Sequence, residues 1–263
     1  MVTAAATIRA PLFVPADRPD RFAKAAASGA DAVILDLEDA VAAGAKDAAR
    51  AQVQARFTGL PVLLRINPAG TPWHAADLAA ARAGGFAAVI LPKAEDAATV
   101  AAVAAALDDM PVIALVETGL GLAQARAVAA AGVARLAFGS VDFCADLGCA
   151  HLREVLLPAR VELVLASRLA GIAPPLDGVT VEIADAAPAA ADAAHARALG
   201  MTGKLCIHPR QVAAVRREFL PTEAEVDWAR RVLASGDGAV AVDGAMVDEP
   251  VRLRARGILA AAG

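Results

Sequence analysis

The sequence predicts an α/β fold, a TIM (β/α)8 barrel followed by a C-terminal helical extension. Short apolar runs alternate with helical segments at intervals of roughly 25–30 residues, which is typical of a barrel of parallel strands. The runs are continuously apolar rather than alternating, as expected for a parallel sheet that is covered on both faces. A doubly wound open sheet is the alternative architecture.

The strands are predicted from short apolar runs that are bounded by turn residues. In chain order these runs are Pro11–Pro15, Ala32–Leu37, Pro61–Ile66, Ala87–Leu91, Pro111–Val116, Leu136–Phe138, Val179–Ile183 and Lys204–Ile207.

The helices between them are predicted from their polar and apolar pattern and from C-terminal glycines such as Gly29 and the Gly84-Gly85 pair. In chain order they are Pro19–Ser28, Ala45–Phe57, Trp73–Arg82, Ala97–Leu107, Leu122–Ala131, Leu152–Ala170, Ala186–Leu199 and Gln211–Phe219.

The composition changes after Phe219, where the barrel pattern ends. Thr222–Ala234 is predicted to be a helix, Gly236–Gly244 is rich in turn residues, and Ala245–Leu259 combines a strand-like stub with a helix. We therefore expect a barrel catalytic domain over residues 1–220 and a C-terminal extension over 221–263. A barrel does not need this extension, so we expect it to serve as a lid, as an oligomer contact, or as both.

Composition narrows the class of protein. The net charge is −4, aromatic residues make up 3% and tyrosine is absent, which argues against nucleic acid as a partner. Cys144, Cys149 and Cys206 show no zinc or disulfide spacing, which favours a reducing compartment. The N-terminus lacks a signal-peptide core, and no run approaches the roughly 20 apolar residues of a membrane span. We expect a cytoplasmic protein without membrane contact.

Charged residues follow most of the predicted strands. In a barrel, the residues just past the carboxyl ends of the strands line the active site, so these charges are expected to converge on one rim. For any single residue the alternative is a solvated or helix-capping position, and Glu38-Asp39 and Asp146 could serve as such caps. The charged residues concerned are Asp36, Glu38, Arg65, Lys93, Glu117, Asp142, Asp146 and Glu182.

Glu117 and Asp142 form the centre of the predicted site, because they follow two neighbouring strands within the stretch Pro111–Asp146. Two carboxylates, completed by water and substrate, suit Mg²⁺, which can then polarise a carbonyl or stabilise an enolate. Arg65 offers a planar fork for a substrate carboxylate. The four histidines show no zinc spacing, and Cys144 is expected to be a buried structural thiol.

Several phrases occur together in one order: RAPLFVPADRPDRFAKAAASGADAVILDLEDAV, LLRINP, LPKAE, VETGLGL, FGSVDF, GKLCIHPRQV and DGAMVDEPVRLRARGIL. With these phrases the sequence resembles the citrate lyase β-subunit-like branch of the HpcH/HpaI aldolase family, over nearly the whole chain. That family consists of TIM barrels, commonly trimeric, that bind Mg²⁺ and make or break C–C bonds in hydroxy-acid or acyl-CoA substrates.

The resemblance implies roles for the residues of the predicted rim. Glu117 and Asp142 match the two metal ligands, and Arg65 matches the anchor of a substrate carboxylate. Glu38 and Asp39 match the acidic pair behind the metal, where carboxylates orient the water ligands.

It also implies contacts with the rest of the substrate. The backbone amides of Gly139 and Ser140 are placed beside the oxoacid. Asp248 matches a carboxylate that, in relatives, reaches into a neighbouring subunit and handles the proton of the thioester α-carbon. Arg9, Lys24 and Lys204 are candidates for contacts with coenzyme A.

The resemblance implies a Mg²⁺-dependent lyase that cleaves or forms a 3-hydroxy-3-carboxy acyl-CoA, such as citryl-, citramalyl- or malyl-CoA. The products of cleavage are a 2-oxoacid and an acyl-CoA, and the protein is expected to be a homo-oligomer, a trimer or a multiple of it. One alternative is a metal-dependent aldolase of free 4-hydroxy-2-oxo acids, against which Asp248 argues. The other is a non-catalytic barrel, a subunit or a ligand sensor. The segment TGLGL after Glu117 differs from the TARG-like segment of many relatives, so local substrate contacts are expected to differ.

Overall fold

The computed structural model describes residues 4–236 and 238–262. The chain folds into two compact units, Met1–Arg216 and Arg217–Gly263. None of the helices in the described ranges is both long enough and apolar enough to cross a membrane.

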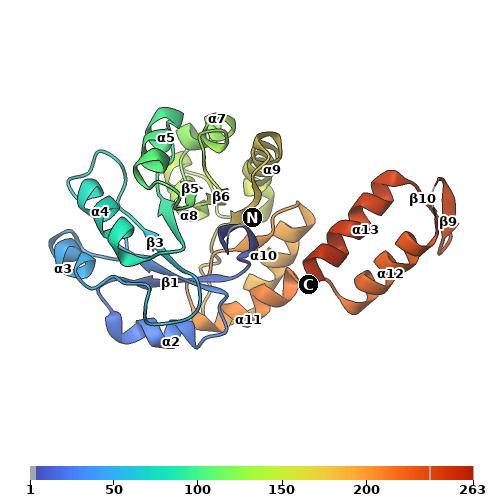
Figure 1. The fold of residues 1–263 in the computed structure, drawn as a ribbon, viewed down its shortest axis with the longest axis horizontal. Helices are drawn as coiled ribbons and strands as arrows, with labels where there is room; N and C mark the ends of the chain where they lie inside the picture. Colours follow the sequence, from blue (N-terminus) through green and yellow to red (C-terminus); the bar gives the residue numbers. More distant parts are fainter. Residues whose placement is uncertain (1–3, 237, 263) are drawn as a thin grey trace. The chain divides into compact units, whose positions relative to one another are not determined.

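The first unit contains a parallel sheet in which each strand pairs with the next along the chain (Figure 1). The sheet closes because Leu12 bridges Cys206, and the backbone N–H of Phe13 donates to the carbonyl of Cys206 at 2.9 Å. This confirms the predicted TIM-barrel fold. The strands are β1 (Pro11–Pro15), β2 (Ala32–Asp36), β3 (Val62–Arg65), β4 (Ala88–Leu91), β5 (Val112–Val116), β6 (Arg135–Phe138), β7 (Ala173–Asp177) and β8 (Gly203–Lys204).

Helices lie around the strands and cover the outer face of the barrel (Figure 1). Two short 3₁₀ turns, η1 (Pro19–Arg21) and η2 (Ala43–Ala45), precede α2 and α3. The α-helices of this unit are α1 (Ala4–Thr7), α2 (Phe22–Ala26), α3 (Lys46–Arg50), α4 (His74–Gly84), α5 (Ala97–Ala106), α6 (Gly119–Ala123), α7 (Ala125–Ala129), α8 (Ser140–Leu147), α9 (Arg153–Ala170), α10 (Ala187–Ala198) and α11 (Pro209–Glu218).

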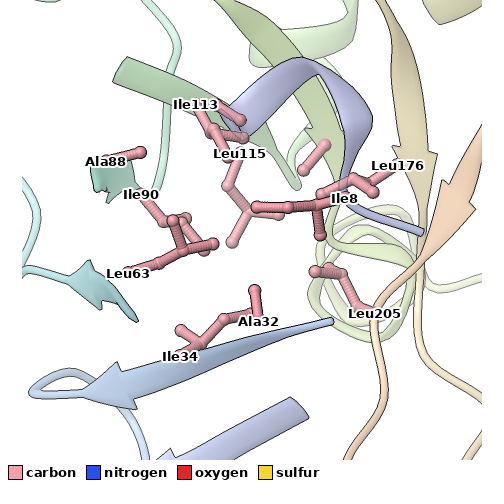
Figure 2. Close-up of a cluster of buried hydrophobic side chains, with 12 residues drawn as sticks. Ile8, Ala32, Ile34, Leu63, Ala88, Ile90, Ile113, Leu115, Leu176 and Leu205 are labelled. Atoms are coloured by element: carbon pink, nitrogen blue, oxygen red, sulfur yellow. The ribbon is translucent and has the colours of Figure 1, made fainter. Parts of the chain in front are cut away.

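The interior of the barrel is filled by apolar side chains from successive strands. Ile34, Leu63, Ile90 and Ile113 are completely buried and point toward one another (Figure 2). Such branched side chains give the layered core of a barrel, and truncating one to Ala costs about 2–5 kcal/mol. Ile8 enters the same cluster from the segment between α1 and β1.

Arg135 ties that segment to the amino ends of the strands. Although it is fully buried, its guanidinium donates to the carbonyls of Ile8 at 2.7 Å, Ala5 at 3.1 Å and Pro174 at 2.7 Å, and to the hydroxyl of Thr202 at 2.8 Å. The amino end of the barrel is therefore closed by satisfied hydrogen bonds, which leaves the carboxyl end for a functional cavity.

The seventh strand was predicted wrongly. It is Ala173–Asp177, with the sequence APPLD, and not Val179–Ile183. The β-branched run has strand propensity, but Val181 and Ile183 are exposed, whereas Leu176 and Asp177 are fully buried. The register shift between β6 and β7 accommodates prolines that normally argue against a central strand.

Two helical segments also differ from the expected ones. Helix α3 ends at Arg50, so most of the expected helix Ala45–Phe57 is turn or irregular. The expected helix Leu122–Ala131 is divided between α6 and α7, because Thr118 caps a helix that begins at Gly119 and ends at Ala123. These two differences concern helix boundaries, whereas α8 (Ser140–Leu147) is a helix that lies outside all the predicted ones.

The second unit packs two helices together with a two-stranded ribbon. Its elements are α12 (Glu223–Ala234), β9 (Val240–Val242), β10 (Ala245–Val247) and α13 (Glu249–Ala262). Thr222 and Glu225 form a capping box at the start of α12, which satisfies backbone N–H groups there. Ala229, Val232 and Ala255 are buried in its small core.

Candidate active site

A cavity of about 500 Å³ opens among the carboxyl ends of the strands. Asp36 and Arg65, the last residues of β2 and β3, lie in its wall together with Phe138 at the end of β6. Glu117 lines it from the position directly after β5. Active sites of TIM-barrel enzymes lie at this end of the strands, so the cavity is the candidate site.

Arg65 is held by two carboxylates. Its Nε and Nη2 lie 2.7 and 2.6 Å from the two oxygens of Asp36, and its Nη1 lies 2.7 Å from Oε2 of Glu38. The guanidinium also lies over the ring of Phe13, 4.9 Å from its centroid. Burial opposes the charge of Arg65, but Asp36 and Glu38 outweigh it and raise the pKa of the guanidinium. Arg65 is therefore a fixed cation, oriented before any ligand arrives.

Glu38 is buried behind this arginine. Burial raises its pKa, while Arg65 and Lys93 act in the opposite direction. Lys93 Nζ lies 3.2 Å from Oε1 of Glu38, and the ammonium of Lys46 donates to the carbonyls of Leu37 and Glu38 at 2.8 Å. The carboxylate of Glu38 thus lies between two cations, Arg65 and Lys93, which suits a role in supporting the site rather than in binding substrate.

Glu117 is the least compensated carboxylate of the cavity. It is 1% exposed, and its Oε1 accepts the backbone N–H of Lys93 at 2.8 Å. Its Oε2 is buried and has no hydrogen-bond partner among the described residues. Burial raises the pKa of Glu117 to about 8, and the negative charges of Glu38 and Asp142 add to that effect.

Gly139 makes room for this carboxylate. A Cβ at position 139 would overlap the Cβ of Glu117 and lie 2.6 Å from its Oε2. Only glycine permits β6 and Glu117 to approach so closely, which is a signal that sequence alone does not reveal.

Asp142 lies in the first turn of α8 and is half-buried at the cavity wall. The structure thus brings together Glu117, Asp142 and Arg65, the three residues on which the predicted site depends. Asp39 also lines the cavity and is exposed. Gly139 and Ser140 complete this part of the wall.

The residues present fit a divalent cation. A cation beside Oε2 of Glu117 would supply the missing partner and would favour the ionised form that burial now disfavours. Within residues 4–236 and 238–262, no group of three or more His, Cys, Asp or Glu side chains could hold a metal by itself. Two carboxylates completed by water and substrate are what Mg²⁺ commonly uses.

Other candidate residues lie elsewhere. Arg9 precedes β1, so it is at the amino end of the strands, away from the cavity. Lys24 is exposed on α2 and does not line the cavity. Lys204 is 1% exposed and lies 3.0 Å from Asp177, so it is a buried ion-pair partner rather than a surface contact. Asp146 accepts the backbone N–H of Gly119 at 2.8 Å and joins α8 to α6.

Asp248 belongs to the second unit, between β10 and α13. Its side chain is half-buried, and its Oδ1 accepts the backbone N–H of Val251 at 3.4 Å. Asp177 is not among the predicted site residues, because the apolar run that predicts a seventh strand, Val179–Ile183, lies beyond it. Lys93 is predicted only as a charge at a strand end, although it contacts both Glu38 and Glu117.

Fold and cavity together define a TIM-barrel protein with an acidic, arginine-containing site at the carboxyl ends of its strands. The family model described as HpcH/HpaI aldolase/citrate lyase matches residues 9–209. The chain belongs to this family, as the sequence phrases predicted.

Curated relatives and solved structures agree with this assignment. A citrate lyase subunit beta-like protein of Mycobacterium tuberculosis is 42% identical, over 96% of this chain and 94% of its own length. A (3S)-malyl-CoA thioesterase of Cereibacter sphaeroides is 33% identical, over 97% and 94%. The crystal structure of protein CitE from M. tuberculosis with magnesium, acetoacetate and coenzyme A matches with a TM-score of 0.85 and 42% identity, over 99% of both chains.

Proposed function

We propose that this protein is a Mg²⁺-dependent carbon–carbon lyase. Its substrate is a 3-hydroxy-3-carboxy acyl-CoA such as malyl-, citramalyl- or citryl-CoA, which it cleaves to a 2-oxoacid and an acyl-CoA, or forms from them. The observation that carries the proposal is the buried, unpartnered Oε2 of Glu117, in one cavity with Asp142 and Arg65. The relatives support it, since one solved structure holds magnesium, acetoacetate and coenzyme A and another holds magnesium and oxaloacetate.

Glu117 and Asp142 are the proposed ligands of Mg²⁺. When bound, the ion supplies Lewis-acid stabilisation of the oxygens that carry negative charge during the reaction. The proposed role of Asp39 is to orient water around the ion, which its exposed position at the cavity wall supports.

Arg65 binds the substrate carboxylate. A guanidinium has five N–H groups; hydrogen bonds to Asp36 engage two of them, and Nη1 is ion-paired with Glu38. The remaining N–H groups are available to a ligand in the cavity that Arg65 lines. Because the ion pairs fix the guanidinium, binding costs little reorganisation.

Cleavage removes the proton of the 3-hydroxyl and converts this carbon to the keto group of the oxoacid. The electron pair of the broken C–C bond passes to the thioester enolate, and a proton then goes to its α-carbon. We propose that Asp248 of a neighbouring subunit donates that proton. The proposal therefore includes a homo-oligomer, a trimer or a multiple of it. The backbone amides of Gly139 and Ser140 contact the oxoacid, and Lys24 is a surface contact for coenzyme A. We place the protein in the cytoplasm.

The test is a screen of the three thioesters and of free 4-hydroxy-2-oxo acids, with Mg²⁺ and with chelator, with separate assays for oxoacid, acyl-CoA and free coenzyme A. Oxoacid and acyl-CoA in equal amounts, only with Mg²⁺, are the expected result. Free coenzyme A without oxoacid would instead indicate hydrolysis, the activity named for the 33% identical relative. Cleavage of free 4-hydroxy-2-oxo acids alone would indicate an aldolase. If no substrate is turned over, the remaining function is that of a non-catalytic barrel, a subunit or a ligand sensor.

Two variants and a matched control assign the metal ligands. Glu117→Gln and Asp142→Asn are each expected to lower kcat at least about 100-fold, as losses of central charged groups do. Asp146→Asn changes a carboxylate on the same helix as Asp142 that does not line the cavity, so its activity should stay near wild type. Full activity of the first two variants would refute the assignment.

A further inference from the structure

Ser140 and His151 form a hydrogen-bonded pair at the cavity wall. Nε2 of His151 lies 2.9 Å from Oγ of Ser140, and Ser140 is 1% exposed and lines the cavity. A hydroxyl joined to an imidazole is an arrangement that can accept and pass on a proton. The roles assigned above use the backbone of Ser140 and leave this pair without a function.

The fold fixes the position of the hydroxyl. Ser140 is the first residue of α8, and it packs against Gly178, which directly follows β7. A Cβ at position 178 would overlap Oγ of Ser140 and lie 3.0 Å from the carbonyl oxygen of Phe138. Glycine at this position is therefore needed for the contact between Ser140 and His151.

The surroundings of His151 favour the neutral imidazole. Burial lowers its pKa, and the positive charges of Lys204 and Arg160 lower it further, against the opposing charges of Asp192 and Asp177. A neutral imidazole near pH 7 is the form that can accept a proton. The carboxylate of Asp192, one of these opposing charges, accepts a hydrogen bond from the hydroxyl of Thr180 at 2.6 Å.

The carboxylates in and behind the cavity wall already have roles. Asp36 and Glu38 are ion-paired with Arg65, Glu117 and Asp142 are the proposed metal ligands, and Asp39 is proposed to orient water. Cleavage nevertheless requires a group that takes the proton of the substrate hydroxyl. The pair of Ser140 and His151 is a neutral acceptor beside these charged groups.

We propose that Ser140 and His151 form a proton relay for the substrate hydroxyl, an inference that rests on the proposed lyase function. During cleavage, Oγ of Ser140 accepts the 3-hydroxyl proton and gives its own proton to Nε2 of His151. The oxygen of the substrate keeps the electron pair and becomes the keto oxygen, while the C–C electron pair passes to the enolate. Condensation returns the same protons in reverse. Ser140 is the catalytic residue of the relay, and His151 is a positioning residue that acts through it.

The experiment measures Mg²⁺-dependent cleavage of the acyl-CoA thioester that the screen identifies as substrate, from about pH 5.5 to pH 9. The proteins compared are the wild type and the variants Ser140→Ala, His151→Gln and His195→Gln. His195 is the matched control, a histidine of α10 that does not line the cavity. We expect kcat to fall about 100-fold or more in the first two variants, with KM changed by less than about 3-fold. The acidic limb of the kcat profile should be present in the wild type and His195→Gln and absent in His151→Gln.

Isothermal titration calorimetry of pyruvate binding in the presence of Mg²⁺ tests whether the site of each variant is intact. If His151→Gln does not fold, His151→Asn takes its place. Cleavage by His151 variants at the wild-type rate, with the acidic limb retained, would overturn the relay and leave the lyase function standing. A rise in KM with unchanged kcat would assign the pair a binding role and would also overturn it. Absence of cleavage by the wild type would overturn the lyase function, and the relay with it.

Discussion

Two clusters of charged side chains lie near the carboxyl ends of the strands, and they differ in sign. In the acidic cluster, defined as Asp36, Glu38, Glu117, Arg65 and Lys93, carboxylates outnumber cations. In the basic cluster, defined as Asp177, Arg160 and Lys204, cations outnumber the carboxylate. Asp36, Arg65 and Glu117 of the acidic cluster line the cavity, whereas the side chains of the basic cluster are at most 3% exposed.

The pKa values of the buried carboxyl groups in the two clusters are therefore shifted in opposite directions. Arg160 and Lys204 outweigh the burial of Asp177 and lower its pKa. Burial of Glu117 is not outweighed, and its pKa rises to about 8. A buried carboxylate that is ion-paired within the protein, such as Asp177, helps to hold the barrel together. A buried carboxylate without such a partner, such as Glu117, can bind a cation from solution.

The largest effect is expected from breaking the basic cluster. Asp177→Asn leaves two buried cations without their carboxylate and should lower the free energy of unfolding by about 3–5 kcal/mol. Denaturant titration measures this loss. Asp109→Asn, in an exposed turn, should stay within about 0.5 kcal/mol of wild type. Equal stability of the two variants would refute a structural role for Asp177.

The basic cluster also predicts a pH dependence. The folded-state pKa of Asp177 is lowered, so its contribution to stability is present above its unfolded value of about 3.9 and is lost as the pH falls through the folded value. Acid unfolding of the wild type should therefore show a steep loss of stability below about pH 4 that is weaker in Asp177→Asn. Parallel curves for the two proteins would contradict this.

The acidic cluster should respond in the opposite direction. The folded-state pKa of Glu117 is raised to about 8, so metal-free protein should lose stability as the pH rises from about 4.5 through 8. Glu117→Gln removes this penalty and should raise the free energy of unfolding near pH 7 by about 1–3 kcal/mol. Thermal unfolding without metal tests this, and a less stable variant would show that Glu117 is satisfied in the metal-free protein.

A smaller effect is expected where the backbone makes room for the acidic cluster. Gly139→Ala places a methyl group against Glu117 and should cost about 1–3 kcal/mol and weaken Mg²⁺ binding. Gly44→Ala, where a Cβ meets no atom within 4 Å, is the matched control. Unchanged Mg²⁺ affinity of Gly139→Ala would show that Glu117 can move without loss.

The smallest effect concerns the cysteines, where burial raises the thiol pKa more than the nearby Arg160 and Lys204 lower it. Burial raises the pKa of Cys144 to about 11 and that of Cys206 to about 12. Cys149 is half-buried, so alkylation near pH 7.5 followed by mass spectrometry should label it before the other two. Faster labelling of Cys144 or Cys206 would mean that the barrel opens locally.

Much of the fold could be predicted from the sequence, because continuous apolar runs such as AVILD and VIALV are typical of strands that are buried on both faces. The prediction failed at β7, where APPLD lacks strand propensity and its position follows from packing and a register shift. The prediction that Glu117, Asp142 and Arg65 share one rim followed from barrel geometry. Contacts between distant segments, such as Gly139 with Glu117, could not be predicted, because they depend on register and helix placement.

Mg²⁺ binding measured by isothermal titration calorimetry tests the central claim most directly. The wild type and Asp146→Asn should bind one ion per chain, whereas Glu117→Gln and Asp142→Asn should show binding at least about 100-fold weaker, since each loses a charged ligand. Binding of Mg²⁺ to Glu117→Gln with the affinity of the wild type would contradict the account.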